Sequence, residues 1–285
     1  MNSDLIAGQS STDAGTFVVF VGIAPHPPLL IPEVGGERIA RVADSQTAMR
    51  EFALRLVNST PETVVVISPH SPLDPKAFIA RATPILHGDF GEFYAPGVSL
   101  SFANDVEFLK QLRGAAGAEG VELLELVGER ALDHGAMVPL YYLRDAGWRG
   151  AILVVGFTVQ SNEKHLAFGR AIARAAAAAQ RRVAVVASAD LSHRLIIGGP
   201  YEFEPTAHMF DEKIVEAIAA GDAEAVVAID PELRNRAGEC GYRSILVALG
   251  SVEKAALRQQ VLSYEAPFGV GYMVATLVES DSVHA

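Results

Sequence analysis

The chain has 285 residues, of which half are hydrophobic and a fifth are charged, and its formal net charge at pH 7 is −11. Affinity for nucleic acid comes mainly from Lys and Arg side chains that displace counterions, so this acidic balance argues against a nucleic-acid-binding protein. Cys240 is the only cysteine, which excludes an intrachain disulfide and argues against a secreted, disulfide-stapled fold. No apolar run reaches the ~18 residues that a membrane span needs, and the first residues lack the basic start of a signal peptide. A cytoplasmic protein without a membrane anchor is the expectation.

Five apolar runs, rich in β-branched residues, predict strands. They are continuous rather than alternating, as expected for strands that are covered on both faces of a sheet. In chain order they are Phe17 to Ala24, Thr63 to Ser68, Ala151 to Val159, Arg182 to Ser188 and Gly271 to Val278.

Helical patterns lie between these strands and predict an α/β fold. The helices expected are Glu37 to Leu56, Ala136 to Leu143, His165 to Gln180, Phe210 to Ala219 and Tyr242 to Leu249. Alternating strands and helices are typical of a largely parallel central sheet with helices on both faces. The Gly- and Pro-rich stretch Pro84 to Val98 predicts a hairpin or a long loop over the sheet. Without repeats or linkers, we expect one domain over residues 17–280 after a flexible tail, residues 1–16.

Two histidines follow predicted strands directly. His26 lies between Pro25 and Pro27, and His70 follows Pro69 at the end of the next strand. Proline fixes the local backbone and ends the strand, so each imidazole is held at the carboxyl end of its strand. Ligands bind at that edge of open α/β sheets, and imidazole is the commonest protein metal ligand. One such histidine alone would indicate a structural hydrogen bond, but two of them favour a shared metal site.

Two further histidines have similar positions. His193 follows the fourth predicted strand, with Asp190 three residues before it, either to orient a ring or to cap a turn. His134 precedes the helix Ala136 to Leu143, where it is either a site residue or a helix N-terminal residue with Asp133 as the cap. The remaining histidines lie in polar or helical contexts and are predicted to be solvated surface residues: His87, His165, His208 and His284.

A metal site needs a third ligand, and the best candidate is Glu239 or Cys240 at the start of a predicted helix. Glu239 would complete a two-histidine, one-carboxylate face that leaves open positions on iron(II). Cys240 would favour softer ions, zinc or copper(I). Adjacent residues rarely point at one ion, so we expect one of the two to bind it, with Glu239 preferred. The alternative for Glu239 is an acidic residue that stabilises the first turn of a helix.

The order of these motifs resembles the LigB-like family, which comprises the catalytic subunits of class III extradiol ring-cleavage dioxygenases and the Memo-like proteins. The resemblance covers residues from about Val18 to Val278. The motifs that carry it are Ala24-Pro25-His26-Pro27-Pro28, Ser68-Pro69-His70, Leu132-Asp133-His134-Gly135, Asp190-Leu191-Ser192-His193, Gly238-Glu239-Cys240-Gly241-Tyr242-Arg243-Ser244 and Pro267-Phe268-Gly269-Val270-Gly271-Tyr272.

The resemblance implies roles for individual residues. His26 and His70 match the iron-binding histidines, His193 matches the acid–base histidine, and His134 matches a histidine that lines the substrate pocket. Ring-cleaving members carry a glutamate as third ligand, whereas Memo-like members carry a cysteine before a glycine. This chain has both residues, as Glu239-Cys240-Gly241.

The function expected is iron(II)-dependent extradiol cleavage of a catechol or aminophenol with O2. His193 would accept a phenolic proton and later return one, which suits a group whose unperturbed pKa is ~6.5. Manganese, zinc or copper are alternative metals. The alternative functions are a Memo-like metal-binding or redox protein without ring cleavage, and a metal-dependent hydrolase. A homo-oligomer or a small second subunit are the expected protein partners, if any.

Overall fold

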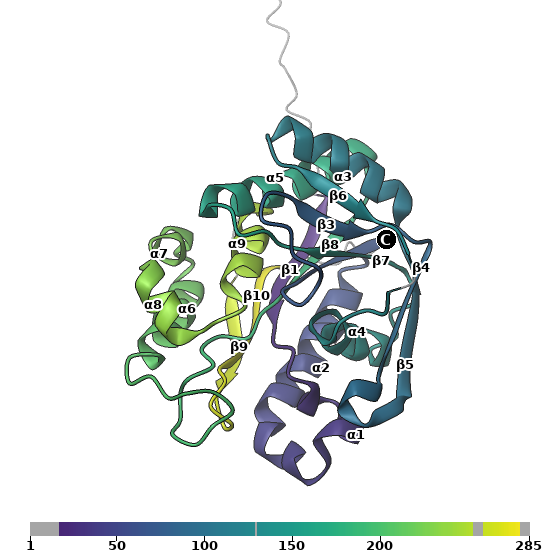
Figure 1. The fold of residues 1–285 in the computed structure, drawn as a ribbon. Coiled ribbons are helices and arrows are strands. Elements are labelled where there is room, and N and C mark those ends of the chain that lie inside the picture. The colour runs from purple at the N-terminus through teal and green to yellow at the C-terminus, as the bar shows by residue number, and fades with distance from the viewer. Residues whose placement is uncertain (1–16, 129, 253–258, 280–285) are drawn as a thin grey trace, which may run out of the picture.

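The computed structural model describes residues 17–128, 130–252 and 259–279, so the predicted tail and His284 lie outside the described residues. A mostly parallel sheet of eight strands crosses the protein in the order β6-β3-β7-β2-β8-β1-β10-β9 (Figure 1). Parallel pairing joins β2 to β7 and β8, β1 to β8, and β3 to β6. Antiparallel pairing joins β10 to β1 and β9, and β3 to β7. A separate hairpin pairs β4 with β5.

The described strands are β1 (Val18–Ala24), β2 (Thr63–Ser68), β3 (Phe78–Arg81), β4 (Ile85–Phe90), β5 (Ala95–Ala103), β6 (Leu123–Leu126), β7 (Ala151–Gly156), β8 (Val183–Ser188), β9 (Gln260–Glu265) and β10 (Tyr272–Glu279). The described α-helices are α1 (Pro32–Gly35), α2 (Ala43–Asn58), α3 (Val106–Ala118), α4 (His134–Asp145), α5 (Asn162–Ala179), α6 (His208–Ala220), α7 (Ala223–Val227), α8 (Pro231–Ala237) and α9 (Tyr242–Gly250). Short 3-10 helices are η1 (Pro28–Leu30), η2 (Gly36–Val42) and η3 (Gly91–Phe93).

Alternate side chains of the central strands enter two separate cores. Val21 and Val65 point into a core built with α3, α5 and α9, whereas Phe20 and Val64 point into a core built with α2 and α4. Successive side chains of a strand point to opposite faces, so a strand with both faces covered must be apolar throughout. This explains why these strands are continuous apolar runs, and it confirms the predicted single α/β arrangement (Figure 1).

All five predicted strands are present, as β1, β2, β7, β8 and β10. The predicted helix Glu37 to Leu56 begins as a 3-10 helix, η2, and becomes α-helical only at Ala43. The predicted hairpin over Pro84 to Val98 is the β4–β5 pair, which extends to Ala103. Among the described residues, no helix is long and apolar enough to cross a membrane.

The prediction that His165 lies on the surface is wrong. Its side chain is fully buried in the first turn of α5, where its ring lies 5.3 Å from that of Phe78. The ring nitrogens lie 2.9 and 3.0 Å from the carbonyl oxygens of Ser161 and Thr158. His165, Phe168 and Ile172 form a stripe at helical spacing that faces the core, which is why the residue is inside. His87 and His208 are exposed, as predicted.

Candidate metal centre

The predicted histidines meet because three of their strands are neighbours. β2, β8 and β1 lie side by side and parallel, so their carboxyl ends share one edge of the sheet. His26 follows the end of β1, His70 follows β2, and His193 follows β8. The fourth, His134, is the first residue of α4, and its ring lies 4.1 Å from that of His70 and 5.7 Å from that of His26. Four imidazoles far apart in the sequence thus form one cluster.

Cys240 reaches the same edge from the turn between α8 and α9. Gly238 ends α8 with a left-handed backbone, φ 66°, which turns the chain sharply toward the sheet. The backbone N–H of His193 donates to the carbonyl oxygen of Ala237, at 3.0 Å. Gly241 packs so closely against the end of β8 that an added Cβ would lie 2.5 Å from the Cβ of Ala189. The turn is therefore held against the strand end, and the thiol beside it points at the histidines.

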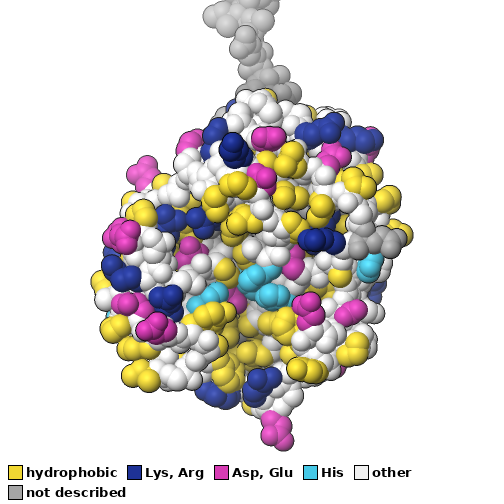
Figure 2. Space-filling view, in the orientation of Figure 1, with side chains coloured by type: hydrophobic (Ala, Val, Ile, Leu, Met, Phe, Trp, Pro, Cys, Tyr) yellow, Lys and Arg dark blue, Asp and Glu magenta, His cyan; other side chains and the backbone are white. Residues whose placement is uncertain are grey.

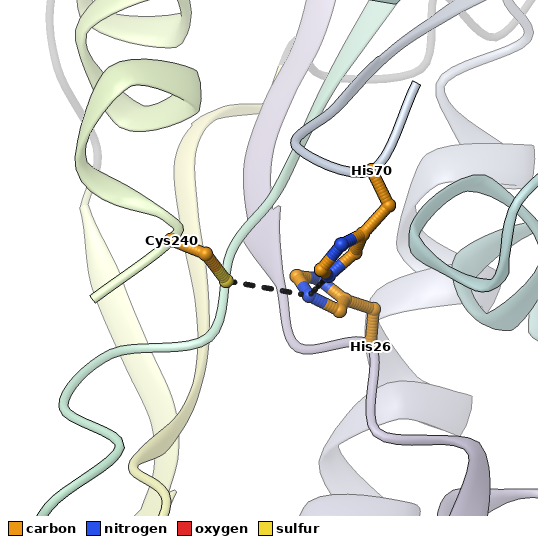
Figure 3. A group of neighbouring side chains, drawn as sticks. All are labelled: His26, His70 and Cys240. Atoms are coloured by element: carbon orange, nitrogen blue, oxygen red, sulfur yellow. Dashed lines mark hydrogen bonds between the residues drawn. The ribbon is translucent and has the colours of Figure 1, made fainter. Parts of the chain in front are cut away.

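Three donor atoms converge in this cluster (Figure 3). Nε2 of His26 lies 3.0 Å from Nε2 of His70 and 3.5 Å from Sγ of Cys240. The three donor atoms lie within 4.8 Å of one another. His26 is buried, Cys240 is half-buried and His70 is exposed, so the cluster opens to solvent on the His70 side.

The hydroxyl of Ser188 fixes which nitrogen of His26 carries the proton. Ser188 has a single hydroxyl proton, and it donates this proton to the carbonyl oxygen of Gly135, at 2.5 Å. The same oxygen lies 2.8 Å from Nδ1 of His26 and must therefore accept from an Nδ1–H group. The lone pair of the neutral imidazole is then on Nε2, which faces His70 and Cys240. This is the tautomer that a metal ligand requires.

Burial keeps the imidazoles neutral. The pKa of His26 is held well below its usual value by burial first, and then by the neighbouring histidines. Burial lowers the pKa of His134 and of His193 to about 4 in each case, and His70 adds to the effect at both. Neutral imidazoles at pH 7 have lone pairs available for a cation or for a proton from a bound ligand.

Two acidic groups beside His26 are also disfavoured as anions. Burial raises the pKa of the Cys240 thiol, and Asp190 adds to the rise. Burial likewise raises the pKa of Asp190 to about 7, against the hydrogen bond that its Oδ1 accepts from the backbone N–H of His26 at 2.8 Å. Oδ2 of Asp190 lies 3.7 Å from Nε2 of His26. A divalent cation in the cluster would reverse this preference, because metal binding displaces the proton of a thiol ligand.

The donor set fits a transition metal. Bond lengths of ~2.05 Å to nitrogen and ~2.3 Å to sulfur in a tetrahedral site put neighbouring donors about 3.3 to 3.6 Å apart. The separations of 3.0 and 3.5 Å are close to this range without rearrangement of the backbone. Imidazole and thiolate donors suit zinc, copper and iron rather than magnesium or calcium.

Glu239 lies apart from this donor set. Its Oε2 accepts a hydrogen bond from the backbone N–H of Tyr242, at 2.6 Å, in the first turn of α9. Burial raises the pKa of this carboxyl, while Arg243 and Arg234 act in the opposite direction. This contact stabilises the first turn of α9, as the alternative interpretation of Glu239 expects. The three converging donors include the thiol of Cys240 and not the carboxylate of Glu239.

Asp133 links the segments that carry His70 and His134, on the open side of the cluster. It caps α4, which is one of the two alternatives that the sequence offers, and its Oδ1 accepts from the backbone N–H of Ala136 at 3.1 Å. Oδ1 also accepts from the hydroxyl of Ser68, and Oδ2 accepts from the hydroxyl of Ser71 at 2.7 Å. The turn that carries His70 is thereby tied to the start of α4. Ser71 had no signal in the sequence, and Ser68 was marked only as part of the Ser68-Pro69-His70 motif, because each hydroxyl gains its role only from the fold.

Aromatic and apolar side chains surround the histidines. The ring of Phe93 lies 5.4 Å from that of His134, and the ring of Tyr201 lies 5.0 Å from that of His193. Figure 2 shows histidine side chains near the centre of this face, with hydrophobic side chains around and below them. These surroundings suit a ligand with apolar faces and a few polar groups.

Comparisons with known proteins agree with this arrangement. The chain is 30% identical over 263 residues to Protein CA_C1420 of Clostridium acetobutylicum, a match that covers 90% of this chain and 56% of that protein. The chain therefore spans about half the length of this curated relative. The crystal structure of uncharacterized protein JW3007 from Escherichia coli K12 has a similar fold, with a TM-score of 0.61 and 15% identity over 91% of this chain and 99% of that one. The profile of the family described as the catalytic LigB subunit of aromatic ring-opening dioxygenase matches residues 21–275, and the chain belongs to this family.

Proposed function

We propose that the protein is a metal-dependent dioxygenase that opens the ring of a catechol or aminophenol with O2. The convergence of His26, His70 and Cys240 in a chain of the LigB family carries the proposal. Iron(II) held by these residues would supply a single centre at which the aromatic diol and O2 meet. The exposed side of His70 leaves that centre open to a small molecule.

The residues around the donor set have separate tasks in this proposal. His193 is neutral at pH 7 because burial lowers its pKa to about 4. We assign to its unprotonated ring the acceptance of the phenolic proton as the substrate binds. His134 lies beside His70 and orients a substrate oxygen by a hydrogen bond. The apolar neighbours of these histidines, Phe93 and Tyr201, limit access of water to the ring.

The third ligand in this proposal is Cys240. Its Sγ lies 3.5 Å from Nε2 of His26, whereas the carboxylate of Glu239 already accepts the backbone N–H of Tyr242. The sequence favours a carboxylate ligand at this position, which would require Glu239 to give up its hydrogen bond with the backbone N–H of Tyr242. The two assignments differ in which substitution releases the metal.

A second function is favoured by the thiol itself. Thiolate ligands select copper(I) and zinc, so the same site suits a Memo-like metal-binding protein that cleaves no ring. A zinc-dependent hydrolase on this sheet is a third reading of the same donors, and it would be active without O2.

The test is metal loading followed by an aromatic substrate panel. The metal-free protein is loaded anaerobically with iron(II), zinc or copper(I), and catechols and aminophenols are then added with and without O2. Yellow ring-opened product that needs both iron(II) and O2 supports the dioxygenase. Tight zinc or copper binding without any product contradicts it in favour of the binding protein, and anaerobic turnover with zinc contradicts it in favour of the hydrolase.

Matched variants test the ligands and the acid–base residue. His26→Ala and Cys240→Ser should lose the bound metal, whereas Glu239→Gln should retain it. His193→Ala should retain the metal and lose about 10²- to 10⁴-fold in turnover, the usual contribution of general acid–base catalysis. His208→Ala removes an exposed histidine of α6 and is the control. Metal lost from Glu239→Gln but kept in Cys240→Ser would reverse the ligand assignment.

A further inference from the structure

Among the described residues, the imidazole of His193 has no side-chain oxygen partner of the kind that orients His26. Ser188 holds Nδ1 of His26 at 2.8 Å. The only polar contact of the His193 ring within the described part of the chain is the 3.7 Å approach of Nε2 to Sγ of Cys240. The backbone of His193 is fixed by Ala237, but that bond does not determine the plane of the ring. A contact with the face of the ring would restrict that plane.

Tyr201 supplies such a contact. Its ring is stacked on the imidazole of His193, with centroids 5.0 Å apart and planes within 19° of parallel. An offset stack of this kind is worth ~0.5–1.5 kcal/mol beyond the area that it buries, and it restricts rotation about the last torsion of the histidine. Tyr201 is 52% exposed, so the stack lies at the surface of the protein.

The loop that carries Tyr201 has a fixed base and an exposed tip. The backbone N–H of Glu204 donates to the carbonyl oxygen of Arg194, at 3.0 Å, which closes the loop. The backbone N–H of Leu195 donates to Gly269, at 3.1 Å, which ties the base to the segment before β10. Between these bonds lie Ile197, which is 83% exposed, and Tyr201. The loop is the segment between β8 and α6 in Figure 1.

We propose that Tyr201 is a positioning residue that holds the imidazole of His193 in the plane from which it exchanges a proton with the substrate. The hydrogen bond between Glu204 and Arg194 at the base of the loop fixes the position of the phenol ring of Tyr201, and the stack fixes the orientation of the imidazole of His193. Nε2 of His193 then stays directed toward Cys240 and the metal side. The proposal rests on the function proposed above, because the proton transfer by His193 is part of it.

The test compares two replacements of Tyr201 with a control on the same loop. Tyr201→Phe keeps the stacked ring, and Tyr201→Leu removes it. Phe203→Leu is the control, because Phe203 is 39% exposed on the same loop and has no ring contact with His193. Metal content is measured for all three variants and is expected to match that of the wild type. The thermal midpoint of unfolding should fall by no more than about 4 °C in Tyr201→Leu, because the lost stack is worth only ~0.5–1.5 kcal/mol.

The first readout needs neither metal nor substrate. The ring resonances of His193 in metal-free protein, assigned by their loss in His193→Gln, should show the upfield ring-current shift of a stacked imidazole. That shift should persist in Tyr201→Phe and Phe203→Leu and disappear in Tyr201→Leu. An unchanged His193 resonance in Tyr201→Leu would overturn the proposal.

The second readout is turnover of the iron-loaded protein. Tyr201→Leu should lower kcat about tenfold, a part of the ~10²–10⁴ that acid–base catalysis supplies, with KM changed less than about twofold. Tyr201→Phe should keep the kcat of the wild type. Equal losses in both variants would assign the effect to the hydroxyl and overturn the stacking role. If the wild type opens no aromatic ring, the proposed function fails, and the ring-current comparison alone decides whether Tyr201 holds His193.

Discussion

The hydroxyl oxygen of Ser188 lies 2.8 Å from Nδ1 of His26, and the hydroxyl proton is already donated to the carbonyl oxygen of Gly135. The serine therefore acts on His26 only as an acceptor, and it directs the lone pair of the imidazole toward His70 and Cys240. The hydrogen-bond partner of a metal-ligating histidine commonly decides how tightly that histidine binds the metal.

Ser188→Ala should weaken metal binding without removing any donor. The imidazole of His26 would lose its acceptor, and the proton could then lie on Nε2, where the metal has to bind. We expect the affinity for zinc to fall about 10- to 100-fold, the range typical of lost outer-shell partners. Competition with a chromophoric chelator measures it.

The control for Ser188→Ala is Ser59→Ala. Ser59 is equally buried, and its hydroxyl donates to the carbonyl oxygen of Leu56 at 2.7 Å, at the end of α2 and away from the cluster. Equal affinities for zinc in the two variants would show that the hydroxyl of Ser188 does not set the tautomer of His26.

Much of the fold was predictable because the sheet imposes a strong pattern on its central strands. Continuous β-branched runs identify β1, β2, β7, β8 and β10, since both faces of these strands are buried. β3 and β6 were missed because each is only four residues long, with β6 at the edge of the sheet and β3 next to it. The helix α3 was also missed, although Asp105 caps it through the backbone N–H of Phe108.

The sequence located the histidines of the candidate site and left the third donor open between Glu239 and Cys240. Proline-flanked strand ends locate His26 and His70, and the parallel order of β2, β8 and β1 brings them together. Glu239 and Cys240 are neighbours, and the backbone of one turn decides which of them faces the histidines. That backbone depends on the close approach of Gly241 to Ala189, a tertiary contact that no local pattern encodes.

Asp133→Asn should destabilise the protein more than the loss of a helix cap explains. One amide NH2 would replace an oxygen that accepts from the hydroxyl of Ser68 or Ser71, and the buried guanidinium of Arg81 would lose the charge 4.0 Å away. An unsatisfied buried group costs ~1–3 kcal/mol, so we expect a loss of about 2 kcal/mol in the free energy of unfolding. Urea unfolding of the metal-free protein measures it.

Asp230→Asn is the matched control for Asp133→Asn. Asp230 caps α8 through the backbone N–H of Glu232, at 3.0 Å, and is exposed. Asparagine caps helices about as well as aspartate, so this variant should change stability by no more than a few tenths of a kcal/mol. A loss in Asp133→Asn no larger than in Asp230→Asn would reduce Asp133 to a simple cap.

His165 should make the stability of the protein depend on pH. Burial lowers the pKa of its imidazole, although hydrogen bonds to Ser161 and Thr158 act in the opposite direction. A histidine with a lowered folded pKa stabilises fully above its unfolded pKa, ~6.5, and this contribution is lost as pH falls through the folded value. The difference in unfolding free energy between wild type and His165→Gln should therefore shrink below about pH 6.5, by at most ~1.4 kcal/mol per unit.

Urea unfolding at a series of pH values from 8 to about 5 tests the prediction for His165. Other buried histidines also make the protein less stable on acidification. Subtracting the unfolding free energy of His165→Gln from that of the wild type at each pH removes their contribution. His208→Gln, which replaces an exposed histidine of α6, is the control variant. Parallel curves for wild type and His165→Gln would contradict the prediction.

Gly241→Ala should move the third donor. The backbone of Gly241, with φ −92° and ψ −21°, is one that alanine adopts freely, so the effect of the methyl group is steric alone. An added Cβ would lie 2.5 Å from Cβ of Ala189 and 2.7 Å from the carbonyl oxygen of Asp190. Because these atoms belong to the two residues that directly follow β8, we expect the turn with Cys240 to move away from His26.

Such overpacking costs ~1–3 kcal/mol of stability, and the retreat of the thiol should also lower the affinity for zinc by about tenfold or more. The control is Gly114→Ala in α3, where an added Cβ meets nothing within 4 Å. Alanine there should stabilise the helix by ~0.5–1 kcal/mol and leave metal binding unchanged. Titration calorimetry with zinc and urea unfolding measure both quantities. A Gly241→Ala protein that is destabilised yet binds zinc as tightly as the wild type would place the metal away from Cys240.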